Sequence, residues 1–250
     1  MYNIYYPYNN KKNESFVNSF EFDPSILTVY KSPYEKKRVG KNNDGGYVID
    51  IIPDIKYNLI IGCGISNDIS FEENFINIYK NISCIVFDGT IDDIPETKED
   101  ILFVKKNIGI DNTSSITNLH NLIMNNENIF LKMDIEGYEI PWFESLTYEM
   151  LDKILQMVLE FHSPFSERET NVFKKISKTH VMVHLHGNNC GELKTFKNII
   201  IPETFECTFI NKKYLKEPYI LNTDKLPLSL DMPNKENSID YDLNYKPFTN

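Results

Sequence analysis

Carboxylates and histidines stand at the ends of apolar runs in this sequence, where they could move protons or bind a ligand. The segment NIFLKMDIEGYEIPWF ends an apolar run with Asp134 and adds Glu136 and Glu139 directly after it. The segment VLEFHSP ends another run with Glu160 and His162. A histidine titrates near neutral pH and could serve as a general base. These residues are therefore candidates for catalysis or for substrate binding, provided that the fold brings them together.

A third group follows in VHLHGNN, which contains His184, His186, Asn188 and Asn189. Carboxylate oxygens and imidazole nitrogens could also bind a divalent cation such as Mg²⁺, which would acidify a bound hydroxyl group. The possible ligands of such an ion are Asp134, Glu160, His162 and His186. The candidate substrate residues are Glu136, Glu160, Asn188 and Asn189.

Some of these residues could instead have a purely structural role. A lone histidine on a strand is more often a core or surface residue, which we expect for His184. Glu136 and Glu139 could simply offset the positive end of a helix that begins near Pro141, a residue favoured in a first helical turn.

The elements that position these residues follow from alternating apolar and amphipathic stretches, a pattern typical of a mostly parallel α/β sheet. Apolar runs predict strands, and apolar residues near helical spacing predict helices between them. The predicted strands are 57–62, 83–88, 100–106, 128–134, 154–161, 180–186 and 206–212. The predicted helices are 68–80, 114–126, 141–150 and 166–178. We expect one domain over 1–250, with an extension at 1–37, a core at 38–212 and an extended tail at 213–250.

A glycine turn ends the first predicted strand, in GCGISND. Gly62 and Gly64 there would let the backbone approach a nucleotide-like ligand, and Asp88 ends the next strand, where a carboxylate can accept ribose hydroxyls. Asn67 replaces the third glycine of the dinucleotide fingerprint, which disfavours NAD. A merely structural turn is the alternative.

Composition limits the function classes. The formal net charge of -10 disfavours a general nucleic-acid or anionic-membrane binder. The four cysteines are scattered and form no CxxC pair. We find no signal peptide or membrane-spanning run, and we expect a soluble cytoplasmic protein. Tyrosines near the N-terminus could close over an acceptor or make a homodimer contact; they are Tyr2, Tyr5, Tyr6 and Tyr8.

The motifs RVGKNNDGGYVI, IIGCGISNDISFEENF, VFDGT, FLKMDIEGYEIPWFESL, VLEFH and HLHGNN resemble FkbM-like S-adenosylmethionine (SAM)-dependent methyltransferases in their order and spacing. The resemblance covers roughly residues 38–210. It implies a Rossmann-like class I methyltransferase fold: a seven-stranded, mostly parallel sheet with an antiparallel last strand and helices on both faces.

The resemblance also implies site residues. Gly62, Gly64 and Ser66 would form the SAM turn, and Asp88 would hold the ribose. Asp134 would border the transferred methyl group. Independently of the resemblance, the positions of His162 and His186 at strand ends make either one a candidate for the base. Residues that would border the adenine are Asn107, Ser114 and Ser115.

One departure concerns the SAM amino group. Class I enzymes usually carry an acidic residue just before the first glycine, whereas this chain has Ile60 and Ile61. Asp44, Asp68 or Asp134 could supply the charge. The segment with Asp44, Gly45 and Gly46 could be a plain turn, or it could cover the cofactor as part of the wall of its site. We favour the second interpretation.

The function that we expect is O-methylation of a sugar, nucleotide sugar or glycan. A non-catalytic module that keeps the fold, an NAD-dependent oxidoreductase, and a methyltransferase for another small molecule or for an RNA hydroxyl remain alternatives.

Overall fold

The computed structural model describes residues 20–94 and 99–250. The N-terminal tyrosines and most of the predicted extension at 1–37 therefore lie outside the described residues. Within the described part, no helix combines the length and the apolar character that crossing a membrane requires.

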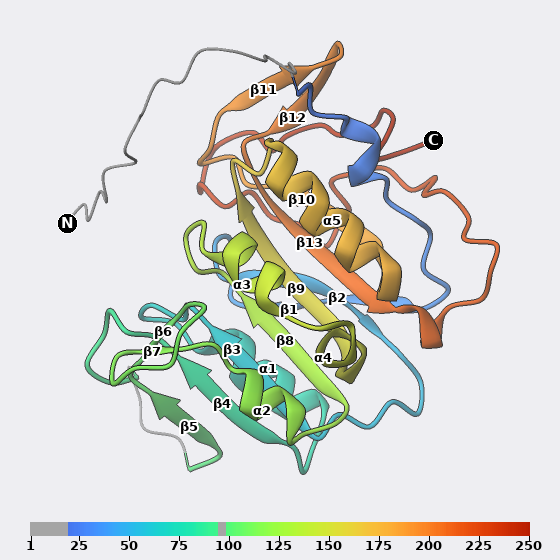
Figure 1. The fold of residues 1–250 in the computed structure, drawn as a ribbon. Helices are drawn as coiled ribbons and strands as arrows, with labels where there is room; N and C mark the ends of the chain where they lie inside the picture. Colours follow the sequence, from blue (N-terminus) through green and yellow to red (C-terminus); the bar gives the residue numbers. More distant parts are fainter. Residues whose placement is uncertain (1–19, 95–98) are drawn as a thin grey trace, which may run out of the picture.

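A seven-stranded sheet forms the centre of the molecule (Figure 1). Its strands, from one edge to the other, are β10 (His180–Gly187), β13 (Thr204–Asn211), β9 (Ile154–His162), β8 (Ile129–Met133), β3 (Leu59–Cys63), β4 (Ser83–Phe87) and β5 (Ile101–Val104). The strands from β9 to β5 are parallel, and β13 runs antiparallel between β9 and β10. The seven predicted strands and the antiparallel last strand are confirmed.

The strand order reverses at β3. This strand pairs with β4, the next strand along the chain, on one side and with β8 on the other. In an open α/β sheet the ligand crevice lies outside the carboxyl ends of the strands at such a reversal. The fold is Rossmann-like, with the strand arrangement of class I methyltransferases, as predicted. It brings the carboxyl ends of β3, β4 and β8 to the same edge of the sheet.

Alternate residues of the central strands enter two separate cores. On β3, Ile61 packs with Trp142 and Phe143 of the helical layer, while Ile60 packs with Phe71 on the opposite face. This is the expected result of the two-residue period of a strand that is buried on both faces. Figure 1 shows the helices α2 to α5 on one face, and α1 with the strands β1 and β2 on the other.

Two predicted helices agree well with the structure. Helix α1 spans Ser70–Ile78, and α5 spans Glu167–Thr179. Ser166 and Glu169 form a capping box at the start of α5, which explains its sharp beginning.

The prediction for 141–150 was wrong in detail, because two short helices occupy this stretch. Helix α3 spans Glu139–Ser145 and α4 spans Tyr148–Lys153. Leu146 between them is extended, and Thr147 caps α4 by accepting a hydrogen bond from the Met150 backbone amide.

The prediction of one helix over 114–126 was also wrong. Only α2, His120–Met124, is helical, and it is preceded by the short strands β6 (Asn107–Ile108) and β7 (Ile116–Thr117). The Thr113 hydroxyl accepts hydrogen bonds from the backbone amides of Ser115 and Ile116. Such side-chain bonds offer the backbone an alternative to the helix, which explains the later start.

Two hairpins were not predicted. Strands β1 (Glu35–Gly40) and β2 (Gly46–Ile51) pair over one face of the sheet, and β11 (Leu193–Phe196) pairs with β12 (Ile199–Pro202). Short 3₁₀ helices occupy Pro24–Leu27 and Lys212–Tyr214. The segment 215–250 forms no helix and no strand. An isolated antiparallel β-bridge joins Leu221 of this segment to Tyr30.

Candidate active site

The glycine turn lies at the carboxyl end of the central strand β3. Gly64 has a φ of +71°, and its amide donates to the Phe87 carbonyl at 3.0 Å. A Cβ at Gly64 would lie 1.6 Å from the Asp134 carbonyl oxygen, and one at Gly62 would lie 2.4 Å from the Glu72 carboxylate. Position 64 therefore needs glycine, and the turn packs directly on the backbone that follows β8.

Asp88 ends β4 beside this turn and is only 7% exposed. One carboxylate oxygen accepts a hydrogen bond from the Ser66 amide at 2.8 Å, and the other accepts two from Thr90, at 2.7 Å and 2.6 Å. An ionised carboxylate offers about four acceptor positions, so one more donor can be accommodated and the Thr90 hydroxyl can be displaced. The site thus fits a ligand with adjacent hydroxyl groups, as a ribose has.

Asn107 is brought next to Asp88, as the predicted cofactor site requires. Its side-chain amide packs on Gly89, where a Cβ would lie 2.4 Å from it, and its backbone amide donates to the Ser115 carbonyl. Ser114 and Ser115 are exposed. The predicted adenine-bordering residues therefore share one loop region beside the glycine turn.

The turn of the β1–β2 hairpin lies against the loop that follows the glycine turn. A Cβ at Gly45 would lie 2.5 Å from the Asp68 carboxylate, which also forms an ion pair with Lys41 at 3.2 Å. The Lys41 amide donates to the Ser70 hydroxyl. The DGGY segment is thus both a hairpin turn and part of the surroundings of the glycine turn, with Asp44 exposed at its tip.

Two predicted catalytic residues, Asp134 and His162, converge with the predicted substrate residue Glu160 at the ends of β8 and β9. Ligand atoms of Asp134, Glu160 and His162 lie within 4.8 Å of one another. Strands β8 and β9 run parallel with Met133 opposite Leu159, so Asp134 comes level with Glu160. This relation between neighbouring strands explains why residues 26 to 28 positions apart meet.

His162 is surrounded by carboxylates. It contacts Glu136 at 3.4 Å, Glu160 at 3.6 Å and Glu139 at 3.8 Å. Glu139 is fully buried and accepts a hydrogen bond from the Ile135 amide, so it does more than offset the positive end of α3. Glu136 is largely exposed at the rim.

Burial and mutual charge interactions shift the pKa values of the residues in this cluster. Burial raises the pKa of Asp134 to about 6, although the Lys132 and His162 charges oppose it. Burial and the neighbouring Asp134 charge also raise the pKa of Glu160. Burial lowers the pKa of His162, but Glu139 and Glu160 outweigh it and raise that pKa to about 9. At neutral pH the metal-free His162 thus carries a proton.

His186 lies in a different arrangement. Its Nδ1 contacts Glu206 at 3.1 Å, and its Nε2 contacts Asp240 at 2.9 Å. Both ring nitrogens are therefore occupied, and His186 does not share the group formed by Asp134, Glu160 and His162. The nearby His184 contacts Asp231 at 2.9 Å in the same way.

The two predicted asparagines have different partners. Asn188 donates from its side chain to Glu160 at 2.8 Å and so orients that carboxylate. Asn189 instead accepts from the Lys235 amide and donates to the Ile239 carbonyl, which ties down the segment after residue 230.

Other residues at the site were missed by sequence reasoning. Lys132 is buried on β8 and donates to the Gly64 carbonyl at 2.6 Å; a lone lysine inside FLKMD was a usable signal. Glu72 is buried in the first turn of α1, and neither carboxylate oxygen has a hydrogen-bond partner among the described residues. Glu206 lies opposite Glu160 on β13, which only the strand order reveals.

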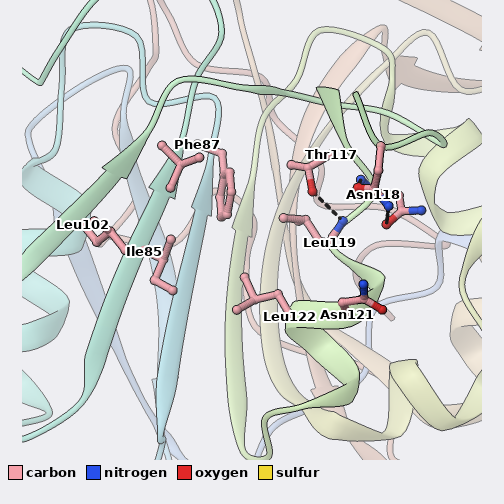
Figure 2. A pocket seen from close by; sticks show the side chains of 10 residues that line it. Ile85, Phe87, Leu102, Thr117, Asn118, Leu119, Asn121 and Leu122 are labelled. Carbon is pink, nitrogen blue, oxygen red and sulfur yellow. Dashed lines mark hydrogen bonds between the residues drawn. The ribbon is translucent and has the colours of Figure 1, made fainter. Parts of the chain in front are cut away.

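A separate pocket lies between β4, β5 and α2 (Figure 2). Ile85 and Leu102 line it from the sheet, and Leu119 and Leu122 line it from the α2 side. None of the predicted cofactor residues lines this pocket. We therefore place the candidate active site at the strand ends and not here.

Comparisons with known proteins add little to this picture. No protein-family model and no curated protein matches the chain. Among solved structures, a candidate rRNA methylase from Clostridium thermocellum is 8% identical with a TM-score of 0.38, covering 63% of this chain and 88% of its own. TrmN from Thermus thermophilus is 8% identical with a TM-score of 0.34, covering 63% of this chain and 45% of its own. These similarities are too weak to transfer an activity or a residue.

Proposed function

We propose that the protein is a SAM-dependent methyltransferase that acts on a hydroxyl group of a sugar-type acceptor. The observation that carries this proposal is the contact of the glycine turn with the acidic cluster: Gly64 packs on the Asp134 backbone at the reversal of strand order. The proposed nucleoside site and the proposed proton-accepting site would thus be adjacent.

The chain's own residues fit the cofactor. Gly62 and Gly64 let the turn after β3 pack closely on Glu72 and on the Asp134 backbone. Asp88, with Asn107 packed on the adjacent Gly89, would take the ribose side. Bound SAM would supply an electrophilic methyl group on a sulfonium. The missing acidic residue before Gly62 leaves Asp134 and Asp68, both near the turn, as the groups that could bind the amino group.

The acceptor class follows from the cluster and from the charge of the chain. Methyl transfer to oxygen needs a positioned hydroxyl and a group that takes its proton. The carboxylates of Asp134 and Glu160 can accept hydrogen bonds from neighbouring hydroxyls, and Asn188 holds Glu160 in place. A net charge of -10 favours a neutral polyhydroxyl acceptor over a polyanion such as RNA. The resemblance to FkbM-like enzymes supports the same class.

Calorimetric titration with SAM and S-adenosylhomocysteine (SAH) tests the cofactor. We expect micromolar binding of both, weakened at least tenfold in Asp88→Ala. The matched control is Asp92→Ala, four residues further along and exposed beside Lys105, which should bind like the wild type. No binding by a folded wild-type protein, or binding of NAD instead, would overturn the cofactor assignment.

An assay of SAH release with panels of sugars, nucleotide sugars and RNA tests the acceptor. We expect turnover with a hydroxyl-bearing sugar and a loss of at least a hundredfold in Glu160→Gln, with SAM binding retained. SAM binding without turnover on any of these acceptors would favour a non-catalytic module, and turnover on RNA alone would refute the sugar assignment.

A further inference from the structure

The cluster of Asp134, Glu160 and His162 has the composition of a metal centre. It offers two carboxylates and one imidazole from the ends of two adjacent strands, with ligand atoms within 4.8 Å of one another. Asp134 follows the rigid strand β8, and Glu160 and His162 close β9. Their Cα positions are thus set by the sheet and do not depend on a mobile loop.

Each residue of the cluster has one buried side-chain atom without a hydrogen-bond partner among the described residues. The Glu160 side chain is 4% exposed, and its Oε2 has no hydrogen-bond partner among the described residues. Asp134 Oδ1 and His162 Nδ1 are likewise buried without a hydrogen-bond partner. A buried carboxylate oxygen without a donor costs free energy unless a cation or another ligand satisfies it.

Two neighbouring residues hold the side chains of the cluster in place, as outer-sphere groups do for metal ligands. Asn188 donates to Glu160 Oε1 at 2.8 Å and leaves Oε2 free. Glu139, fixed by the Ile135 amide, lies 3.8 Å from His162 Nδ1. Such partners hold a ligating side chain in one rotamer and tune its basicity.

From this geometry we propose that Asp134, Glu160 and His162 bind one divalent transition-metal ion of the Mn²⁺ type. Ligands that lie about 2.1 Å from such an ion are about 3 to 3.5 Å apart, so small side-chain rotations close the site. The imidazole makes Mg²⁺, which prefers oxygen ligands, a weaker match than Mn²⁺ or Zn²⁺. His186, with both nitrogens held by Glu206 and Asp240, is not a ligand.

The consequence for the reaction rests on the proposed function. A divalent ion next to Gly64 would bind an acceptor hydroxyl, lower its pKa and hold it beside the cofactor turn. His162 is 24% exposed at its side chain and marks the open side of the cluster. An acceptor would reach the ion from that side. The binding of the metal itself does not depend on this role.

The test is titration of the full, EDTA-treated chain with Mn²⁺, followed by the electron paramagnetic resonance signal of the free ion, with Zn²⁺ as competitor. We expect one Mn²⁺ per chain, displaced by Zn²⁺, and at least tenfold weaker binding in Asp134→Asn, Glu160→Gln and His162→Gln. The matched control is Asp92→Asn, which removes an exposed carboxylate outside the cluster and should change Mn²⁺ affinity less than twofold.

Thermal unfolding establishes that each variant is folded. Wild-type protein that binds neither Mn²⁺ nor Zn²⁺ would overturn the proposal and identify His162 as a protonated partner of the carboxylates. Binding that Glu160→Gln leaves unchanged would also overturn it. SAM titration of the same metal-free protein separates the two proposals, because cofactor binding without metal binding contradicts only the metal site.

Discussion

Gly64 and Asp134 approach so closely that no side chain fits between them: a Cβ at position 64 would lie 1.6 Å from the Asp134 carbonyl oxygen. This contact joins the cofactor turn to the acidic cluster. The geometry of the cofactor turn therefore depends on that of the acidic cluster. The backbone at Gly64 cannot move away from that at Asp134 without breaking the pairing of β3 with β8.

Gly64→Ala should therefore disrupt folding and cofactor binding together. The added methyl group meets backbone, and the φ of +71° is strained for alanine, so we expect a loss of more than 3 kcal/mol in the free energy of unfolding. Urea unfolding followed by circular dichroism measures this. Gly137→Ala is the control: its φ is +94°, but nothing lies within 4 Å of the new Cβ, so the loss should be about 1 to 2 kcal/mol. Equal losses at the two positions would contradict the close contact.

Lys132 and Glu72 should behave as a coupled buried pair. Burial raises the pKa of Glu72, and the Lys132 charge opposes that rise. Lys132→Met removes this charge and the hydrogen bond to Gly64, so we expect a loss of about 3 kcal/mol in stability. Adding Glu72→Gln should recover part of it, because the unpaired buried carboxylate is gone. A double-mutant cycle in urea gives the coupling, and purely additive effects would show that the two side chains do not interact.

His186 should tether the C-terminal segment and not take part in cofactor binding. It lies between Glu206 of β13 and Asp240, so His186→Gln should release the region around Asp240. Hydrogen exchange measured by mass spectrometry should rise around residues 231–243, while SAM affinity changes less than twofold. His120→Gln, which alters a histidine bonded to Ser145 on the helical face, is the control and should leave this exchange unchanged. A large loss of SAM binding in His186→Gln would instead place His186 in the site.

His180 should make stability depend on pH. Burial lowers the pKa of His180 to about 4, while its Nε2 donates to the Ile154 carbonyl. The unfolded chain, with a histidine pKa near 6.5, therefore binds the proton more readily, and stability falls as the pH drops from about 6.5 towards 4. At pH 5 this one group costs about 2 kcal/mol relative to pH 7.

Urea unfolding at pH 7 and pH 5 tests the effect of His180. The loss between the two values should be smaller in His180→Gln than in the wild type by about that amount. An identical pH dependence in both proteins would show that His180 is not the group responsible.

Much of the fold could be predicted because the buried strands are continuous apolar runs. IIG, CIVF, IFLKM and ILQMVLEF each become a central strand, since a sheet covered on both faces needs apolar residues on both sides. Strand β1, EKKRVG, pairs outside this sheet and alternates between exposed and half-buried residues, so it lacked that signal.

The site could be predicted only in part. Asp134, Glu160 and His162 were recognisable because each ends a strand whose direction was known. The partners of His184 and His186 were not, because Asp231 and Asp240 lie in a segment without regular structure and reach the histidines across 47 and 54 residues. No local pattern encodes such contacts, which depend on the path of the segment.

The position of β3 between β8 and β4 bears on how the protein unfolds. The Gly64 amide bonds to the end of β4, and the Asp134 amide bonds to the Cys63 carbonyl. The first bond extends the pairing of β3 with β4 and the second extends that of β3 with β8, so both depend on β3, although 70 positions separate the two amides in the chain. They should exchange with solvent in one cooperative event, and no partly unfolded form will retain the cofactor turn while lacking the acidic cluster.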